Sequence, residues 1–230
     1  MTIRYHNDLI QGTEEWLAAR RGLITASEMK LIMTPNGKPA DNDKARAHLW
    51  ELLAQRITGR TEPQYISDDM LRGEEEESEA RTLYSEHYAP VTECGFVTND
   101  QWGFTIGYSP DGLVGDDGLI EIKSRRQRFQ VQTIVENVGE ETIPAEYMLQ
   151  IQTGLLVTGR AWCDFISFSN GLPMAVIRVT PIADVHQKIV DAAEDAEIRL
   201  RTLIGRYAAA VNSDARLIPT VYRERMEILA

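Results

Sequence analysis

Apolar residues recur at helical spacing in several stretches of the chain. Residues 41–59, 67–88 and 144–159 each combine this spacing with an Asp, Asn, Ser or Pro that can begin a helix, and the first and third end on a glycine. A shorter helix is predicted over 27–33, starting at Ser27. The longest helix is predicted over about 183–207. Its apolar face comprises Val185, Ile189, Ala192, Ala196, Leu200 and Leu203.

Four other stretches have the composition of strands, namely 103–108, 118–123, 162–169 and 174–180. The Gly- and Asp-rich segment after the first stretch predicts a hairpin to the second, and Asn170-Gly171 predicts a hairpin between the last two. The order of elements predicts an α/β fold with a central mixed β-sheet flanked by helices, one of them a crossover. We expect one domain over residues 1–230.

The balance of charge argues against a general nucleic-acid coat. The chain carries 24 Lys and Arg against 35 Asp and Glu, which gives a formal net charge of −11. Non-specific binding of nucleic acid depends on cations that meet phosphates. Two basic clusters, Arg20-Arg21 and Arg125-Arg126 with Arg128, nevertheless lie close in sequence to the candidate chemistry described below. A basic lining inside an acidic body would suit DNA that is held in a confined channel.

Residues 1–10 lack the basic and apolar regions of a signal peptide, and no apolar run reaches the length of a membrane span. We therefore expect a cytoplasmic protein without a membrane partner. Cys94 and Cys163 have no metal-ligand spacing and are expected to be reduced, packed thiols.

The most informative motif is Ser109-Pro110-Asp111-Gly112, followed ten residues after the aspartate by Glu121-Ile122-Lys123. Residues two apart in a strand point the same way, so Glu121 and Lys123 share one face while Ile122 points into the core. Two carboxylates and a lysine beside a hairpin suit a hard cation such as Mg²⁺, with the lysine orienting or deprotonating an attacking water. This spacing is typical of a nuclease centre.

Each of these matches has a simpler explanation when it is taken singly. Pro-Asp-Gly is a common turn, and Glu121 and Lys123 could form an exposed cross-strand pair. Their order on the predicted hairpin, between a carboxylate-bearing helix and a glutamine-bearing helix, favours the functional interpretation. In the first of these helices Glu76 and Glu77 flank the apolar stripe on opposite sides, and periodicity leaves open which of them supplies a third carboxylate.

Two further segments have both a structural and a functional interpretation. Thr25 and Ser27 can simply begin a helix, but Arg20 beside such hydroxyls also makes a site for a terminal phosphate, because the free backbone N–H groups of a helix N-terminus would bind the anion together with the guanidinium. Gln150 and Gln152 lie on the helix predicted between the strand pairs. The apolar residues around them imply that at least one amide is partly buried and needs a hydrogen-bonding partner.

These motifs together resemble the lambda-type exonuclease family, also called YqaJ-like, within the PD-(D/E)-x-K nuclease superfamily. The resemblance runs from Trp16 to about Phe168, and four separated motifs fall in the family's order. It implies a restriction-endonuclease-like α/β core. It also selects Glu77 over Glu76 as a metal ligand, since Gly73, Glu77, Ala80 and Arg81 match the family's helix motif.

The resemblance implies a role for each matching position. A 5′-phosphate would be bound by Arg20, Ser27 and Ser109. One or two Mg²⁺ ions, with Mn²⁺ able to substitute, would be held by Glu77, Asp111, Glu121 and the carbonyl of Ile122. Catalysis would involve Asp111, Glu121, Lys123 and Gln152, the better candidate of the two glutamines. Met70 takes the place of a leucine that wedges into the duplex end. Apart from the resemblance, the basic cluster beside the motif leads us to expect that Arg125 and Arg126 contact the DNA.

The function implied is a Mg²⁺-dependent 5′→3′ exonuclease that digests one strand of linear double-stranded DNA and leaves a 3′ single-stranded tail for homologous recombination. Its partners would be double-stranded DNA ends, two further copies of the chain in a toroidal homotrimer, and a single-strand annealing protein. Two rivals stay open: another PD-(D/E)-x-K endonuclease or exonuclease, and a non-catalytic DNA-binding recombination scaffold. The complete acid-acid-lysine set argues against the scaffold.

Overall fold

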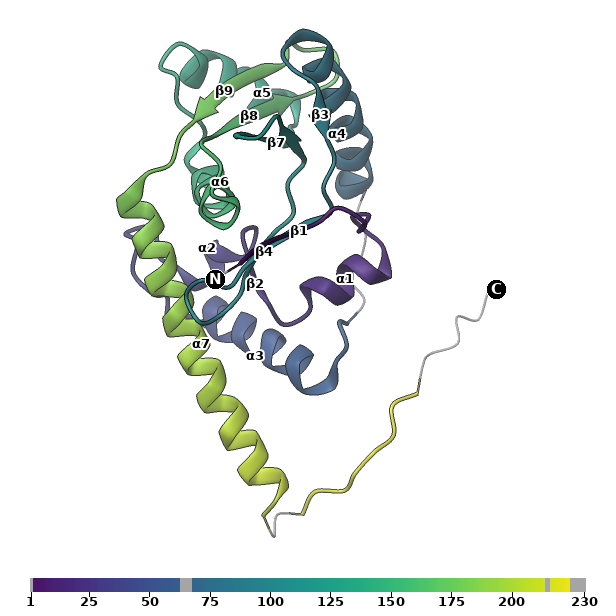
Figure 1. Cartoon of the computed structure of the whole chain (residues 1–230), viewed down its shortest axis with the longest axis vertical. Helices are drawn as coiled ribbons and strands as arrows, with labels where there is room; N and C mark the ends of the chain where they lie inside the picture. Colours follow the sequence, from purple (N-terminus) through teal and green to yellow (C-terminus); the bar gives the residue numbers. More distant parts are fainter. Residues whose placement is uncertain (1, 63–67, 214–215, 224–230) are drawn as a thin grey trace.

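The computed structural model describes residues 2–62, 68–213 and 216–223, without the side chains of 68–70. The chain combines helices with two mixed β-sheets, which confirms the predicted α/β class (Figure 1). In chain order the elements are β1 (Ile3–His6), α1 (Glu14–Arg20), β2 (Ile24–Thr25), α2 (Met29–Ile32), α3 (Asp43–Thr58), α4 (Asp68–His87), β3 (Val91–Thr92), β4 (Phe96–Asn99), β5 (Ile106–Tyr108), β6 (Gly112–Val114), β7 (Gly118–Ser124), α5 (Gln127–Thr133), the π-helix η1 (Ile134–Val138), α6 (Ala145–Thr158), β8 (Trp162–Phe168), β9 (Ala175–Val179) and α7 (Ala183–Val211).

The strands form two sheets where the sequence predicts one. A four-stranded sheet has the order β1-β4-β5-β2, and a five-stranded sheet has the order β3-β6-β7-β8-β9. Both sheets are mixed, because β2 runs parallel to β5 and β7 runs parallel to β8, whereas the other pairs are antiparallel.

The predicted hairpin between residues 103–108 and 118–123 is wrong, because the two stretches belong to different sheets. After β5 the chain crosses to the second sheet through residues 109–111, and the antiparallel partner of β7 is β6. Pro110 has no amide hydrogen to donate, which is consistent with strand pairing that stops at this point. The Ser-Pro-Asp-Gly motif therefore lies at the junction of the two sheets.

The helix α6 lies between the two sheets and contacts both (Figure 1). Ile151 and Leu155 on this helix are buried in the main core. Gly154 lets α6 approach β5 closely, since a Cβ at this position would lie 2.7 Å from the ring of Tyr108. A larger residue would displace the tyrosine from the place that it holds in the site described below.

The strand β7 is buried on both faces, as is usual for a strand with a parallel neighbour inside a sheet. Leu119 belongs to the core that includes α6 and α7, whereas Ile120 and Ile122 belong to a second core beneath α4. Glu121 and Lys123 contact each other on the α6 side. The shared face of these two residues and the burial of Ile122 are both confirmed.

Several predicted helix ends are confirmed. The Asn42 side chain caps α3, and Gly59 ends that helix in the left-handed region at φ 67°. The helix α6 begins after Pro144, ends before Gly159, and belongs to the crossover from β7 to β8. The last helix, α7, is longer than predicted and reaches Val211.

Other predictions need correction. The helix predicted over 27–33 is reduced to the four residues of α2, with Glu28 and not Ser27 at its N-cap. Ser67, the predicted cap of α4, lies outside the described residues. The short elements β1, α1, β2, β3, β4 and α5 are not predicted, because few residues carry their periodicity. Cys94 and Cys163 are buried free thiols, as predicted. Within the described chain, no helix has the length and apolar character to cross a membrane.

An ion pair between Arg56 and Glu197 ties α3 to α7. The Arg56 guanidinium donates to both carboxylate oxygens of Glu197, at 2.8 and 2.5 Å, and its Nε donates to the carbonyl of Gly22 at 2.7 Å. The side chains of Arg56 and Glu197 are 22% and 9% exposed. The pair is therefore mostly removed from water, where the loss of one partner is costly.

We predict that Glu197→Ala lowers the free energy of unfolding by about 3 kcal/mol, because it leaves Arg56 largely buried without its carboxylate. Chemical denaturation measures the change. Glu194→Ala removes an exposed carboxylate from the same helix and serves as the matched control. The control should change stability by less than about 0.5 kcal/mol. Equal stability of the two variants would show that the ion pair contributes nothing.

Candidate active site

The carboxylate of Glu121 lies at the centre of the candidate site and is fully buried. Three side chains donate hydrogen bonds to it: Tyr108 to Oε2 at 2.7 Å, and Lys123 and Gln150 to Oε1 at 2.6 and 2.5 Å. These donors come from β5, β7 and α6, so the carboxylate joins both sheets and the helix between them. The three bonds offset the cost of burying the charge and hold it in one orientation.

Asp111 lies at the junction of the sheets, close to Glu121. Its Oδ2 accepts a hydrogen bond from the backbone amide of Ile122 at 2.6 Å. The segment that carries it is held from two sides, because Arg81 donates to the carbonyl of Asp111 and Gln11 donates to the carbonyl preceding it, both at 2.8 Å. The fold therefore brings together the two acids of the motif.

The structure places Glu77, and not Glu76, next to this pair. Glu77 interacts electrostatically with Glu121 and accepts a hydrogen bond from Arg81 at 2.5 Å. Glu76 instead accepts a hydrogen bond from the hydroxyl of Ser124. Tertiary contacts thus decide a choice that helical periodicity leaves open.

The carboxylates outnumber the cations beside them. Glu77, Asp111 and Glu121 face Arg81 and Lys123. Burial raises the pKa of Asp111 well above its ordinary value, and repulsion from Glu121 and Glu77 raises it further. Burial also raises the pKa of Glu77, against the opposing effect of Arg81. Oxygen donors with an excess of negative charge fit a hard divalent cation such as Mg²⁺.

Lys123 is a protonated amine in this arrangement. Burial opposes its charge, but the carboxylates of Glu121 and Asp111 outweigh burial and raise the pKa of Lys123 above its ordinary value. The ammonium group donates hydrogen bonds and cannot accept a proton while the neighbouring negative charge persists.

Among the described residues, no three acidic, histidine or cysteine side chains form a ready-made metal cage.

A second cluster is built around Arg20, at the end of α1. Its guanidinium donates to the hydroxyl of Ser109 at 2.9 Å and lies 4.4 Å from the centre of the Trp16 ring. The Trp16 indole donates to the same hydroxyl at 3.0 Å. Burial lowers the pKa of Arg20, an effect that a bound anion would reverse. The predicted help from a helix N-terminus is wrong, because α2 is only four residues long; an anion here would depend on the side chains.

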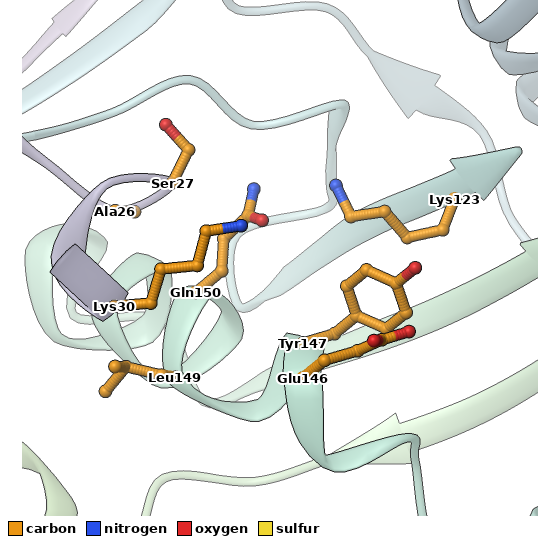
Figure 2. A pocket seen from close by; sticks show the side chains of 8 residues that line it. All are labelled: Ala26, Ser27, Lys30, Lys123, Glu146, Tyr147, Leu149 and Gln150. Atoms are coloured by element: carbon orange, nitrogen blue, oxygen red, sulfur yellow. The ribbon is translucent and has the colours of Figure 1, made fainter. Parts of the chain in front are cut away.

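Both clusters open into one cavity of about 170 Å³, called the first cavity below. Its lining comprises Gln11, Trp16, Arg20, Ala26, Ser27, Tyr108, Ser109, Asp111, Glu121, Lys123 and Gln150. A second cavity, of about 180 Å³, shares part of this lining (Figure 2). It is lined by Ala26, Ser27, Lys30, Lys123, Glu146, Tyr147, Leu149 and Gln150.

Gln150, and not Gln152, is the glutamine at the site. The Gln152 amide is fully buried; it donates to the carbonyl of Thr180 and accepts from the amide of Ile182, both at 2.9 Å. The predicted catalytic position of Gln152 is therefore wrong, and this residue holds the connection between β9 and α7 to α6. Residues two positions apart in a helix, such as Gln150 and Gln152, point in directions that differ by about 200°. This difference is enough for one side chain to face the site while the other faces the core.

The other residues predicted to contact DNA are Arg125, Arg126 and Met70, and the structure supports a different conclusion for each. Arg125 is buried and donates to Glu146 at 2.8 Å and to the hydroxyl of Tyr147 at 2.5 Å. The predicted DNA contact of Arg125 is therefore wrong, because this side chain connects the end of β7 to the start of α6. Arg126 is exposed just before α5, and its contact with DNA stays a prediction. The side chain of Met70 lies outside the described residues, and so does its predicted wedge.

Sequence reasoning missed Tyr108, whose hydroxyl contacts Glu121. The residue is the last of a short apolar strand and has the pattern of an ordinary core aromatic. One rule could have found it: a buried tyrosine usually needs a partner for its hydroxyl, and the nearest acids in the sequence belong to the motif. Gln11, which clamps the Asp111 segment, carries no comparable pattern.

The model of the YqaJ-like viral recombinase domain matches residues 15–161 of the chain. Among solved structures, an alkaline exonuclease (LHK-Exo) from Laribacter hongkongensis is 34% identical, with a TM-score of 0.71 over 86% of this chain and 100% of that one. LHK-Exo in complex with dAMP matches at 33% identity and the same TM-score, over 86% of this chain and 99% of that one.

A phage-related exonuclease from Haemophilus somnus 129PT is 13% identical, with a TM-score of 0.62 over 80% of this chain and 96% of that one, which supports the fold alone. No curated protein matches the chain. The family match spans more than half of the sequence and contains Arg20, Asp111 and Glu121. The chain therefore belongs to the YqaJ-like viral recombinase family, and this membership, together with the similarity to LHK-Exo, indicates a nuclease.

Proposed function

We propose that the protein is a Mg²⁺-dependent 5′→3′ exonuclease that digests one strand of linear double-stranded DNA and leaves a 3′ single-stranded tail for recombination. The observation that carries this proposal is the first cavity, where a cluster suited to a terminal phosphate adjoins the carboxylates and Lys123. A site that binds the end group of a strand beside the cutting centre removes nucleotides from that end. LHK-Exo has been solved with dAMP, and a deoxynucleoside monophosphate is the kind of product that such a reaction releases.

In this proposal Arg20 and Ser109 bind the 5′-phosphate, together with Ser27, which lines the same cavity. The Arg20 side chain is held in place, because its guanidinium stacks on Trp16 and lies 5.7 Å from the ring centre of Phe96. A planar guanidinium suits phosphate, to which it can donate two hydrogen bonds at once. Contacts to phosphate carry no base information, so digestion should not depend on the DNA sequence.

The metal would be held by Asp111, Glu121 and Glu77, with the carbonyl of Ile122 as a further ligand. When bound, Mg²⁺ polarises the scissile phosphate and makes an attacking water more acidic. The support for this role is the excess of negative charge at the site: burial raises the pKa of Asp111, and repulsion from Glu121 and Glu77 raises it further.

Lys123 acts through its ammonium group, which orients the attacking water and stabilises the negative charge that develops on the phosphate. Tyr108 and Gln150 keep the Glu121 carboxylate in place, and this carboxylate holds Lys123 at 2.6 Å. The amine is thus positioned before the substrate arrives, so little reorganisation is needed during the reaction.

We predict that the wild-type protein releases nucleotides from linear duplex DNA only with Mg²⁺ and leaves a covalently closed circular duplex intact. Asp111→Asn should lower the rate by about 10³-fold or more, because it removes an anionic metal ligand while nearly keeping its shape. Cutting of the circle would favour the endonuclease rival. A wild-type protein that binds DNA but releases no nucleotides would favour the scaffold.

The variant Asp111→Asn should also change the stability of the protein, an effect that does not depend on cleavage. Because the pKa of Asp111 is raised in the folded protein, its ionisation destabilises that state as the pH rises through the raised value. At pH 7 without divalent metal, Asp111→Asn should therefore melt at a higher temperature than the wild type, and Mg²⁺ should raise the melting temperature of the wild type but not that of Asp111→Asn. Asp116→Asn, in an exposed turn, is the control and should behave like the wild type.

We predict that Arg20→Ala slows digestion of 5′-phosphorylated duplexes by about 10–100-fold, the loss expected for hydrogen bonds to a charged group. Duplexes with a 5′-hydroxyl should be affected much less, because the partner of Arg20 is the terminal phosphate. Initial rates on the two kinds of duplex measure the difference. Ser109→Ala should show the same discrimination to a smaller degree. An equal loss on both kinds of end would reduce Arg20 to a general backbone contact.

We further propose that three copies of the chain form a ring around DNA and that a single-strand annealing protein receives the 3′ tail. A chain with a net charge of −11 attracts DNA weakly, and a ring retains DNA without strong attraction. Figure 1 shows the C-terminal end of α7 extending beyond the body of the protein. Its apolar face, buried at Leu200, continues as Ile204 and Tyr207, which are 36% and 48% exposed. Such a face suits contact with a second copy.

Light scattering should give a mass of about three times 26.0 kDa for the wild type. Tyr207→Glu should shift the protein toward monomers, because it places a charge on the apolar face of α7. Arg206→Ala changes the net charge by the same amount on another face of the helix, and this control should stay trimeric. A wild-type monomer that still degrades long duplexes without releasing them would overturn the ring.

A further inference from the structure

The second cavity has no part in the roles proposed above, although it shares a wall with the carboxylate site. Lys30 of α2 extends into it. Figure 2 shows its amine directed toward Gln150, with Ser27 on one side and Lys123 across the cavity. Tyr147 forms another wall, and its ring is fixed by stacking on Phe165 with 5.4 Å between the ring centres.

The other charged side chains of the second cavity already have partners. Lys123 donates to Glu121 at 2.6 Å, and Glu146 accepts from Arg125 at 2.8 Å. Lys30, in contrast, forms neither a hydrogen bond nor an ion pair with any residue that the structure describes. Lys30 is exposed to solvent and no acid of the described chain pairs with it, so its ammonium group is available to an anionic ligand.

The linings of the two cavities suggest a path for the digested DNA strand. Arg20 and Asp111 line only the first cavity, Lys30 and Tyr147 line only the second, and Lys123 lines both. A strand with its 5′-phosphate at Arg20 and its first internucleotide phosphate beside Asp111 and Lys123 would continue past Lys123. Its next phosphate would then lie at the second cavity.

We propose that Lys30 binds the second internucleotide phosphate of the digested strand, counted from its 5′ end. This inference rests on the proposed exonuclease function. Lys30 acts as a positioning residue, because a fixed second phosphate restrains the first one beside Lys123 and the carboxylates. The contact is to the DNA backbone, so it does not depend on base identity.

Lys30→Ala should weaken the binding of linear duplex DNA by roughly tenfold when binding is measured in EDTA, where no cleavage occurs. The salt dependence of binding should fall by about one phosphate contact. With Mg²⁺, KM should rise more than kcat falls. Lys30→Arg keeps the charge and should retain most of the binding. Lys44→Ala is the matched control, since Lys44 is exposed on α3 and lines neither cavity.

The decisive test uses three linear duplexes, each with one uncharged methylphosphonate at the first, second or third internucleotide linkage from the 5′ end. The tenfold loss caused by Lys30→Ala should disappear on the duplex whose second linkage is neutral and persist on the other two. A tenfold loss on all three duplexes, or no loss on unmodified DNA, would overturn the proposal. A loss that disappears on a different duplex would overturn the assignment to the second phosphate.

Failure of this inference can be told apart from failure of the proposed function. If the wild type releases nucleotides from linear DNA with Mg²⁺ while Lys30→Ala binds as tightly as the wild type, only the role of Lys30 is wrong. If the wild type releases no nucleotides, the exonuclease proposal is wrong and the role of Lys30 falls with it.

Discussion

Burying the Glu121 carboxylate requires hydrogen-bond donors from three elements at once. An ionised group taken out of water costs several kcal/mol unless nearby donors or cations compensate it. The donors here are Tyr108, Lys123 and Gln150, which lie up to 42 positions apart in the sequence and meet only after both sheets have packed on α6. The site therefore depends on the relative placement of the two sheets. A fold that separated them would leave Glu121 buried without compensation.

The close approach of α6 to β5 makes that placement possible. Gly154 is in the middle of a helix, where glycine is normally unfavourable by about 1 kcal/mol relative to alanine. It is tolerated here because the ring of Tyr108 occupies the space that a side chain would need. Gly154 thus lowers the stability of α6, but it leaves the space that the Tyr108 ring needs for its hydroxyl to reach Glu121. Asp111 is a similar case, because burial and then the neighbouring acids raise its pKa, which makes the site less stable than an uncharged one.

An acidic chain can act on DNA when its cations are concentrated where the substrate lies. Arg20 lines the first cavity, Lys30 lines the second, and Lys123 lines both. Arg125, although close to them in the sequence, is neutralised by Glu146 and holds the fold together. Net charge alone therefore says little about this substrate. The position of each cation relative to its nearest carboxylate decides whether the cation is free to meet a phosphate.

Local signals in the sequence were sufficient to predict the ends of α3 and α6, the long helix α7, the shared face of Glu121 and Lys123, and the α/β class. Each of these follows from capping, periodicity or side-chain alternation, which involve neighbouring residues only. The choices between Glu76 and Glu77, and between Gln150 and Gln152, could not be made in this way. They depend on which side of a helix meets the site, and this is set by contacts with distant strands. The crossing from β5 to β6 and the burial of Arg125 were likewise decided by tertiary structure, because both result from packing two sheets around one helix, and no short stretch of sequence encodes that arrangement.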